Sequence, residues 1–333
     1  MIDQILKKID IILKKANFET FALDNFSSKK NKFCFDLLVK KNDLIFSVKV
    51  FPNIDNINSD IINDIKSLSL ILKSKPLLIG IKNRYQNLED NTIYVRDGLP
   101  FITINTLEKI LDNNKYPYIL AKRGGGIVFI NGGLMKTLRE NQEISRKELS
   151  EKIGVTKRTV CAYENESMHP SEKIANSIKH VLGSNEIFKE VNVLNWKFNY
   201  DLDQTDFIEE IELNDFESHL QTIIEDIGIC SYWYKKGSIP IKLSLFSTNE
   251  ISKIEGFYPL FSGISEDQNK IKALNPKCLK IFTDLFHKTA LFIINNNVKI
   301  PDSFLKNKIP VVRIKNLEEI DDEEEFIELI QDS

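Results

Sequence analysis

Apolar side chains recur at helical or strand spacing along most of the chain, and the changes in spacing predict its elements. Residues 2–16 are apolar at i, i+3 and i+4 positions and predict an amphipathic helix. Residues 33–40 and 44–51 are alternating or apolar runs that predict a β-hairpin. Further on, the pattern predicts a helix over 57–72, a buried strand over 77–81, and a strand over 99–104 leading into a helix over 106–111. This order is typical of an α/β domain.

Two breaks divide this pattern into three regions. Glycines cluster at 123–126 and 131–133 on either side of an apolar run, which predicts a linker or a short β-arm. After Gly183 the helical spacing stops again. We therefore expect domains over residues 1–123, 124–184 and 185–333.

The third region repeats the plan of the first. The spacing predicts helices over 216–229 and 276–286 and strands over 239–246 and 291–294. Leu99–Ile110 resembles Ile309–Ile320, and Lys75–Ile79 resembles Thr289–Ile293. These matches favour a diverged duplication. The alternative is that any strand-turn-helix unit at the end of an α/β domain shows this much likeness.

The central region contains the most specific local motif of the chain. Ser145 is followed three residues later by Glu148, which is a capping box and predicts the start of a short helix through Ile153. Gly154 supplies a tight turn, and Thr156 is placed to cap the next helix, at about residues 157–165. The sequence thus predicts two short helices that meet at an angle.

The two helices and the turn between them share an apolar inner side, and the second helix has a polar outer face. The residues expected to face inward are Leu149, Ile153, Val155, Val160 and Tyr163, whereas Lys157, Arg158, Thr159, Cys161 and Ala162 face outward. Lys and Arg can bond guanine edges, Thr can serve several bases, and Ala permits close approach to a major groove. Arg146, at the start of the preceding helix, is placed to contact phosphate, and Thr156 joins the expected contact residues.

The residues between Gly133 and Gly183 closely resemble Cro/C1-type helix-turn-helix domains. That resemblance implies double-stranded DNA as the partner, a recognition helix in the major groove, a homodimer on two half-sites, and an internal ion pair between Arg139 and Glu164. It also implies that Lys157, Arg158, Thr159 and Ala162 face bases. Cys161 stands where a polar residue is frequent in the family and remains a possible contact.

The whole chain also resembles a family of archaeal HTH-type transcriptional regulatory proteins. In that family a Cro/C1 module follows an α/β domain similar to restriction endonucleases. The residues that carry this resemblance are Phe35–Val39, Phe46–Val50, Asn53–Asp55 and Lys122–Gly125. The expected fold is therefore multidomain, α/β plus all-α, with a central helical module between two α/β domains, the first of them a degenerate nuclease-like fold.

Charge is distributed unevenly over these regions. The formal net charge of −3 combines +6 over residues 1–125, +2 over 126–184 and −11 over 185–333. Because electrostatic fields act locally, the sequence pI of about 6.0 does not exclude a DNA-binding face on the central region.

An endonuclease of this kind needs an acid on one strand and an acid-x-Lys pattern on the next, so that two carboxylates hold Mg²⁺. Asp36 and Lys49 fit two of these places, but Ser47 occupies the second acid position, and Glu19 or Asp43 are candidates to compensate. We expect no catalytic residues and no enzyme activity. A nuclease-like DNA-processing protein and a protein-binding adaptor are the alternatives to a transcriptional regulator.

The sequence gives little support for metal binding, cofactor binding or insertion into a membrane. The four cysteines and four histidines lack metal-ligand spacing, and no glycine-rich phosphate motif is present, so we expect no metal and no cofactor. The longest apolar runs fall far short of the roughly 20 residues of a membrane-spanning helix. With no signal-peptide pattern at Met1, the expected location is the cytoplasm and no membrane partner is expected.

Overall fold

The computed structural model describes residues 2–22, 34–42, 44–122, 125–198, 213–234, 242–247, 258, 260–269, 276, 279–280, 284–285 and 288–332. The chain folds into two compact units. One comprises Met1–Thr20, Val48–Ile57 and Lys75–Asn199, and the other comprises Phe21–Ser47, Asn58–Ser74 and Tyr200–Ser333.

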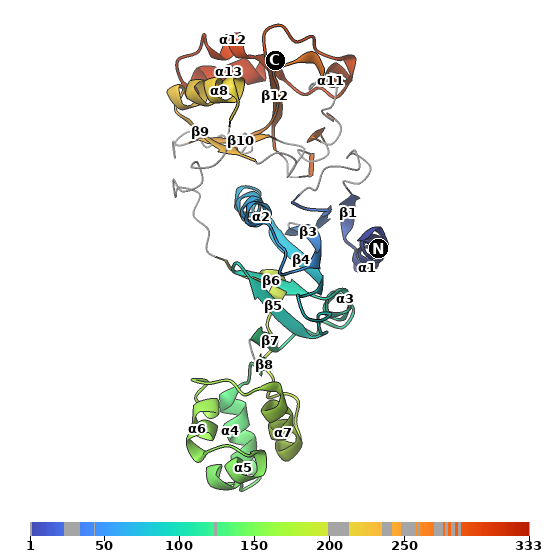
Figure 1. Ribbon diagram of the computed structural model, residues 1–333, viewed down its shortest axis with the longest axis vertical. Helices are drawn as coiled ribbons and strands as arrows, with labels where there is room; N and C mark the ends of the chain where they lie inside the picture. Colours follow the sequence, from blue (N-terminus) through green and yellow to red (C-terminus); the bar gives the residue numbers. More distant parts are fainter. Residues whose placement is uncertain are drawn as a thin grey trace. The chain divides into compact units, whose positions relative to one another are not determined.

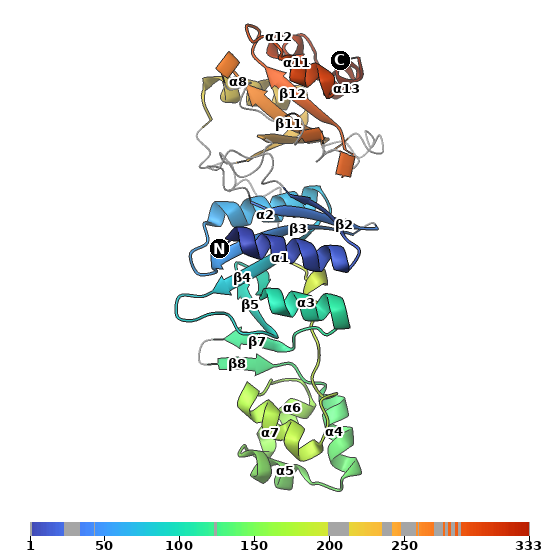
Figure 2. The ribbon, with the colours of Figure 1, turned by 90° about the vertical axis from the view of Figure 1, so that its right-hand side faces the viewer.

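Helix α1 (Ile2–Lys15) confirms the first predicted element. Its buried residues are Leu6, Ile9, Ile12 and Leu13. It lies beside α3 (Ile104–Asn113), where Lys15 Nζ is 2.9 Å from Asp112 Oδ2. Figure 2 shows both helices on the same face of the strands β4–β6. The Thr103 hydroxyl caps α3 by accepting a hydrogen bond of 3.1 Å from the Thr106 N–H.

The first sheet has eight strands (Figure 1). In spatial order they are β1 (Glu19–Ala22), β2 (Leu37–Lys41), β3 (Leu44–Asn53), β4 (Lys75–Lys82), β6 (Leu99–Ile102), β5 (Thr92–Arg96), β7 (Ile119–Lys122) and β8 (Gly125–Val128). β4 runs parallel to β6, and β5 runs parallel to β7. The predicted strands at 33–40, 44–51, 77–81 and 99–104 and the predicted β-arm after Lys122 correspond to β2, β3, β4, β6 and β8.

The hairpin of β5 and β6 extends this sheet beyond the predicted strands. Its turn is formed by Asp97 and Gly98, whose φ angles are 50° and 78°. Positive φ at both central residues of a two-residue turn matches the right-handed twist of the paired strands. Arg96 pairs with Leu99 directly across the turn. β5 thus connects the central strands of the sheet to β7 and β8.

The second unit is built around a five-stranded sheet with the order β13 (Val311–Arg313), β12 (Ala290–Ile294), β11 (Leu260–Ser265), β10 (Leu243–Ser247) and β9 (Ile229–Trp233). Helices α8 (Asp215–Asp226), α12 (Ile314–Leu317) and α13 (Glu323–Gln331) share one hydrophobic core with this sheet. α11 (Asp302–Lys306) contributes Phe304, whose ring packs edge-on against Phe292 at a centroid distance of 4.3 Å. The same unit contains α2 (Ser59–Ile71), which confirms the helix predicted over 57–72.

In both sheets, five neighbouring strands follow one another across the sheet in the order in which they occur in the chain. β1-β2-β3-β4-β6 in the first sheet has the same chain order as β9-β10-β11-β12-β13 in the second. The similar segments found in the sequence form β6 with α3 and β13 with α12. α8, β10 and β12 lie at three of the positions predicted in the third region, whereas most of the helix predicted over 276–286 lies outside the described residues. The proposed duplication stays a prediction.

In the chain, four short helices separate the strands of the first sheet from those of the second. We call the residues before these helices the first α/β part and the residues after them the second. The four helices are α4 (Gly132–Asn141), α5 (Arg146–Ile153), α6 (Lys157–Glu164) and α7 (Glu172–Leu182). Their common core includes Met135, Leu149, Ile153, Val160, Tyr163, Ala175, Ile178 and Leu182. We call these four helices the helical bundle.

The helical bundle is joined to the first sheet at both of its ends (Figure 1). On entry, β8 leads toward α4, and the Val128 N–H donates to the Pro170 carbonyl at 2.9 Å. On exit, residues 185–196 run back past the entering segment, and the N–H groups of Lys189 and Val191 donate to the carbonyls of Phe129 and Pro117, each at 2.9 Å. The rings of Tyr118 and Phe188 stack with centroids 4.7 Å apart. We call residues 185–196 the return segment.

Candidate nucleic-acid interface

The start of α5 is fixed by the capping box that the sequence predicted. The Glu148 N–H donates to Ser145 Oγ at 3.1 Å, and the Ser145 N–H donates to Glu148 Oε2 at 2.7 Å. The hydrogen bond from the Ser145 N–H, together with a side-chain hydrogen bond from Ser145, holds the pKa of the Glu148 carboxyl below its ordinary value. Two of the free N–H groups at this helix start are thereby satisfied.

The turn between α5 and α6 also follows the sequence prediction. Gly154 has a φ of 71°, in the left-handed region where glycine carries no Cβ penalty. The Thr156 hydroxyl then accepts from the Thr159 N–H at 3.1 Å and caps α6. Helix α6 ends at Glu164, one residue before the predicted end.

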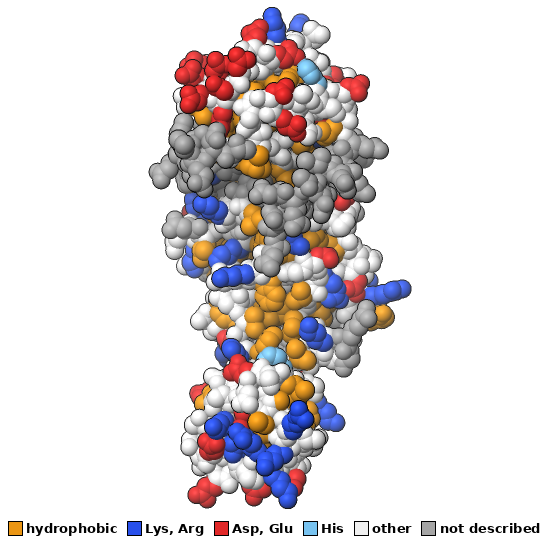
Figure 3. Space-filling view, turned by 90° about the vertical axis from the view of Figure 1, so that its left-hand side faces the viewer, with side chains coloured by type: hydrophobic (Ala, Val, Ile, Leu, Met, Phe, Trp, Pro, Cys, Tyr) orange, Lys and Arg blue, Asp and Glu red, His pale blue; other side chains and the backbone are white. Residues whose placement is uncertain are grey.

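The side chains of α6 divide between core and solvent as expected. Val160 is fully buried and Tyr163 is nearly so, while Val155 is only partly buried. Thr156, Lys157 and Arg158 are exposed, and Thr159, Cys161 and Ala162 are half-buried. The Cys161 Sγ accepts a hydrogen bond from Asn165 Nδ2 at 3.6 Å. Figure 3 shows Lys and Arg side chains gathered on one face of the helical bundle.

A buried ion-pair network fixes the C-terminal end of α6. The Glu164 side chain has no exposed surface, and its Oε1 lies 2.6 Å from Arg139 Nε. This contact confirms the internal ion pair that the Cro/C1 resemblance implies. Arg139 also donates from Nη1 to the Ile144 carbonyl at 2.8 Å, so α4, α6 and the loop before α5 are joined.

Arg146 is part of the same network, which sequence reasoning missed. Its Nε lies 2.7 Å from Glu164 Oε2, and 33% of its side chain remains exposed. The hydrogen bond to Glu164 raises the pKa of the Arg146 guanidinium above its ordinary value. Arg146 is therefore positioned by the buried carboxylate, and its role as a phosphate contact stays a prediction.

The comparisons with known proteins bear on this interface. Residues 135–186 match the helix-turn-helix family, and residues 2–117 match the PD-(D/E)XK superfamily domain. A relative from Methanobrevibacter smithii is 30% identical over 331 residues, covering 99% of this chain and 97% of that protein. Its name describes it provisionally as an HTH-type transcriptional regulatory protein. The chain belongs to this family.

Other family members have the same description. Relatives from Thermococcus kodakarensis and Methanocaldococcus jannaschii are each 27% identical, over 331 and 306 residues. The alignments cover 98% and 92% of this chain, and 95% and 91% of those proteins. No solved structure matches the chain. The resemblances to the helix-turn-helix module and to the archaeal family are thus confirmed.

The PD-(D/E)XK match raises the question of whether the first α/β part of this family member can hold Mg²⁺. Ser47 stands at the second acid position on β3; it is 3% exposed, and its hydroxyl has no hydrogen-bond partner. A neutral hydroxyl is a weak magnesium ligand compared with a carboxylate. Glu19 is exposed on β1, and Asp43 lies outside the described residues. Ser47 therefore does not supply the second carboxylate that a magnesium site at this position needs.

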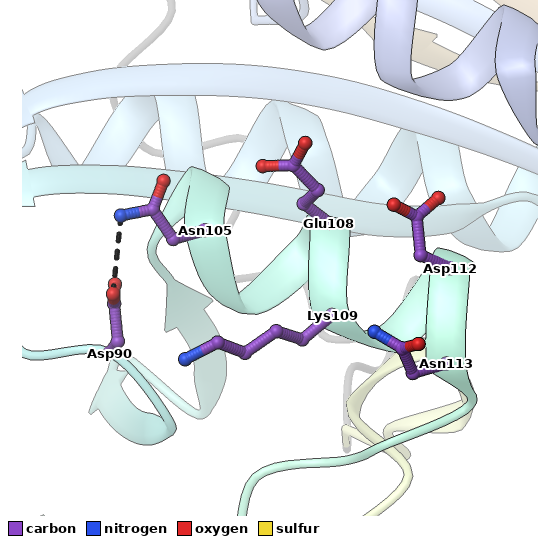
Figure 4. Close-up of a pocket in the computed structure, with 6 residues that line it drawn as sticks. All are labelled: Asp90, Asn105, Glu108, Lys109, Asp112 and Asn113. Atoms are coloured by element: carbon purple, nitrogen blue, oxygen red, sulfur yellow. Dashed lines mark hydrogen bonds between the residues drawn. The ribbon is translucent and has the colours of Figure 1, made fainter.

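A shallow hollow on the outer side of α3 is the other surface feature that could hold a ligand. Figure 4 shows it lined by Asp90, Asn105, Glu108, Lys109, Asp112 and Asn113. Asn105 Nδ2 donates to Asp90 Oδ2 at 3.1 Å, and Asp112 is paired with Lys15 on α1. Asn105 and Asp112 are thus already engaged within the protein, and we assign no ligand to the hollow.

Among the residues that the structure describes, no helix has the length and apolar character needed to cross a membrane. No group of three or more His, Cys, Asp or Glu side chains in the same residues could hold a metal ion.

Proposed function

We propose that this chain is a sequence-specific transcriptional regulator that binds double-stranded DNA with α6 in the major groove. The observation that carries the proposal is the exposed face of α6, where Lys157 and Arg158 stand on a helix fixed at both ends by Thr156 and Glu164. A rigid helix presenting a few long cationic side chains can place them on base edges with little loss of conformational freedom on binding.

Each outward residue of this interface has a role that its chemistry permits. Lys157 and Arg158 reach the guanine O6 and N7 atoms, the Thr159 methyl contacts thymine, and Ala162 allows close approach. Arg146 donates to a phosphate from the part of its guanidinium not directed at Glu164, and Thr156 contacts the backbone beside it. Cys161 contributes van der Waals contact with a base edge. Two copies related by two-fold symmetry would read inverted half-sites.

Selection from a randomised duplex library at two salt concentrations tests this proposal. We expect the wild-type protein to select a motif with inverted half-sites, and Arg158→Ala to lose about 1–3 kcal/mol at one base position because the bidentate contact is removed. Lys179→Ala, an exposed cation on α7, is the matched control and should keep the base preference. If the protein shows no salt-dependent affinity for duplex DNA, this proposal fails, and a protein-binding adaptor is the function that takes its place.

A nuclease-like function is the second candidate, because residues 2–117 match a superfamily that includes this activity. We propose that this chain is not an enzyme, since Ser47 replaces the second carboxylate. The purified protein should therefore nick supercoiled plasmid in Mg²⁺ or Mn²⁺ no faster than its Asp36→Ala variant. Nicking by the wild type that the Asp36→Ala variant lacks would establish the nuclease function instead.

A further inference from the structure

The connection between β4 and β5 exposes an aromatic side chain beside two cations. Tyr85 is 86% exposed, more than any other large hydrophobic residue in the described part of the chain. Lys82 and Arg84, which both precede it in the chain, are exposed as well. We call residues 82–87 the Tyr85 turn. Single exposed apolar residues are common on protein surfaces, so exposure alone decides nothing.

The backbone of the Tyr85 turn is held in place by hydrogen bonds. Asn83 Oδ1 accepts from the N–H groups of Tyr85 and Gln86, both at 2.8 Å. The Asn83 N–H donates to the Gln86 carbonyl at 2.9 Å. None of these bonds involves the side chains of Tyr85 or Arg84, which are presented to solvent by a turn that is already ordered. Ordering before binding lowers the entropic cost of association.

Asp55, an acid next to the turn, is held by the turn itself and by Arg96. Asp55 Oδ2 accepts from the Arg84 N–H at 2.8 Å, and Asp55 Oδ1 lies 2.7 Å from Arg96 Nη2. Burial would raise the pKa of the Asp55 carboxyl, but the Arg84 N–H and the Arg96 guanidinium outweigh it and lower that pKa. Glu89 lies beyond the turn and accepts from Gln86 Nε2 at 3.3 Å. The tip itself, residues 82–87, carries two cations and no acid.

The turn belongs to the same compact unit as the helical bundle. β5, which follows the turn, pairs with β7, and β7 pairs with β8, which leads to α4. Figure 2 shows the β4–β5 connection at the same end of the strands as the last residues of β7 and the first residues of β8. The chemistry at the tip suits a polyanion, because Lys and Arg pair with phosphates and a Tyr hydroxyl donates to them.

We propose that the Tyr85 turn binds the sugar–phosphate backbone of duplex DNA that flanks the stretch bound by α6. Arg84 and Lys82 neutralise phosphates, and Tyr85 packs on a sugar while its hydroxyl donates to a phosphate oxygen. The inference rests on the proposed DNA-binding function. It extends the contact of the protein with DNA from the helical bundle to the first α/β part.

Affinity for two duplexes tests the inference. One duplex contains the selected motif alone, and the other adds a helical turn of arbitrary sequence on each side. Wild type should bind the long duplex roughly tenfold more tightly than the short one, and Arg84→Ala/Tyr85→Ala should lose this gain. The slope of log affinity against log salt on the long duplex should fall by about 1 for each bound copy of the variant, because each copy loses the cation–phosphate contact of Arg84.

A matched double variant and a charge reversal complete the experiment. Leu305→Ala/Lys306→Ala removes another exposed apolar residue with its neighbouring cation, in the other unit, and should behave as wild type. Arg84→Glu should weaken binding to the long duplex more than the double alanine variant does. Equal affinity and salt slope for wild type, Arg84→Glu and Arg84→Ala/Tyr85→Ala on the long duplex overturn the inference and leave the proposed function intact. A wild type that binds neither duplex overturns both.

Discussion

Glu164→Ala should destabilise the helical bundle by about 3–5 kcal/mol, the cost of removing one partner from a buried ion pair. Glu164 accepts from Arg139 Nε at 2.6 Å and from Arg146 Nε at 2.7 Å. The Arg139 side chain is only 6% exposed, so after the substitution its charge would stay buried with only the exposed Glu140 carboxylate beside it. Hydrogen exchange of the α4–α6 amides in the full chain measures this loss, because it reports local opening free energies.

Glu140→Ala is the control for this substitution. Glu140 Oε1 also contacts Arg139, at 3.1 Å from Nη2, but the Glu140 side chain is 54% exposed. An exposed ion pair contributes at most about 1 kcal/mol, so Glu140→Ala should leave amide protection nearly unchanged. If both substitutions accelerate exchange equally, the buried carboxylate does not hold the bundle together.

Gly132→Ala should destabilise the bundle by about 1–3 kcal/mol or more, because the new methyl group has no room. A Cβ at this position would lie 2.3 Å from the Glu164 carbonyl oxygen and 2.5 Å from that of Tyr163. Both atoms belong to the backbone of α6 and cannot rotate away. The substitution would therefore push α4 and α6 apart. We expect a lower thermal unfolding temperature and weaker binding to duplex DNA.

The neighbouring glycine gives the opposite expectation. A Cβ on Gly133 would have Asn131 Oδ1 as its nearest neighbour, at 3.5 Å, which is ordinary contact. Gly133 lies in the first turn of α4, where alanine is the better helix former by up to about 1 kcal/mol. Gly133→Ala should leave stability unchanged or raise it. A similar loss for both variants would show that α4 tolerates no methyl at its start, whatever its contact with α6.

The sequence predicted the helix-turn-helix well because its signals are local. Ser145 with Glu148, the φ of Gly154 and the cap at Thr156 each act within a few residues, so their spacing alone is informative. The Arg139–Glu164 pair was available only through the family resemblance, because 25 positions separate its members in the chain.

Features that depend on distant contacts escaped prediction. Arg146 carries no sequence sign that Glu164 would bind it, and Gly132 was taken for part of a linker although it marks the close approach of α4 to α6. β5 is five residues long and was missed, although its residues Thr92, Ile93, Tyr94 and Val95 are all typical of strands. The Tyr85 turn was overlooked because exposure is a property of the folded chain.

The return segment makes the helical bundle an insertion rather than an appended module. A DNA-binding module on one flexible linker can change its orientation freely. The distance between two such modules on DNA is then limited only by the length of the linkers. Here the backbone enters through Phe129 and leaves through Lys189, and these two residues are hydrogen-bonded to each other at 2.9 Å. We expect half-site spacing in a two-fold pair to be set by the α/β scaffold, so operators lengthened by half a helical turn should lose cooperative binding outright.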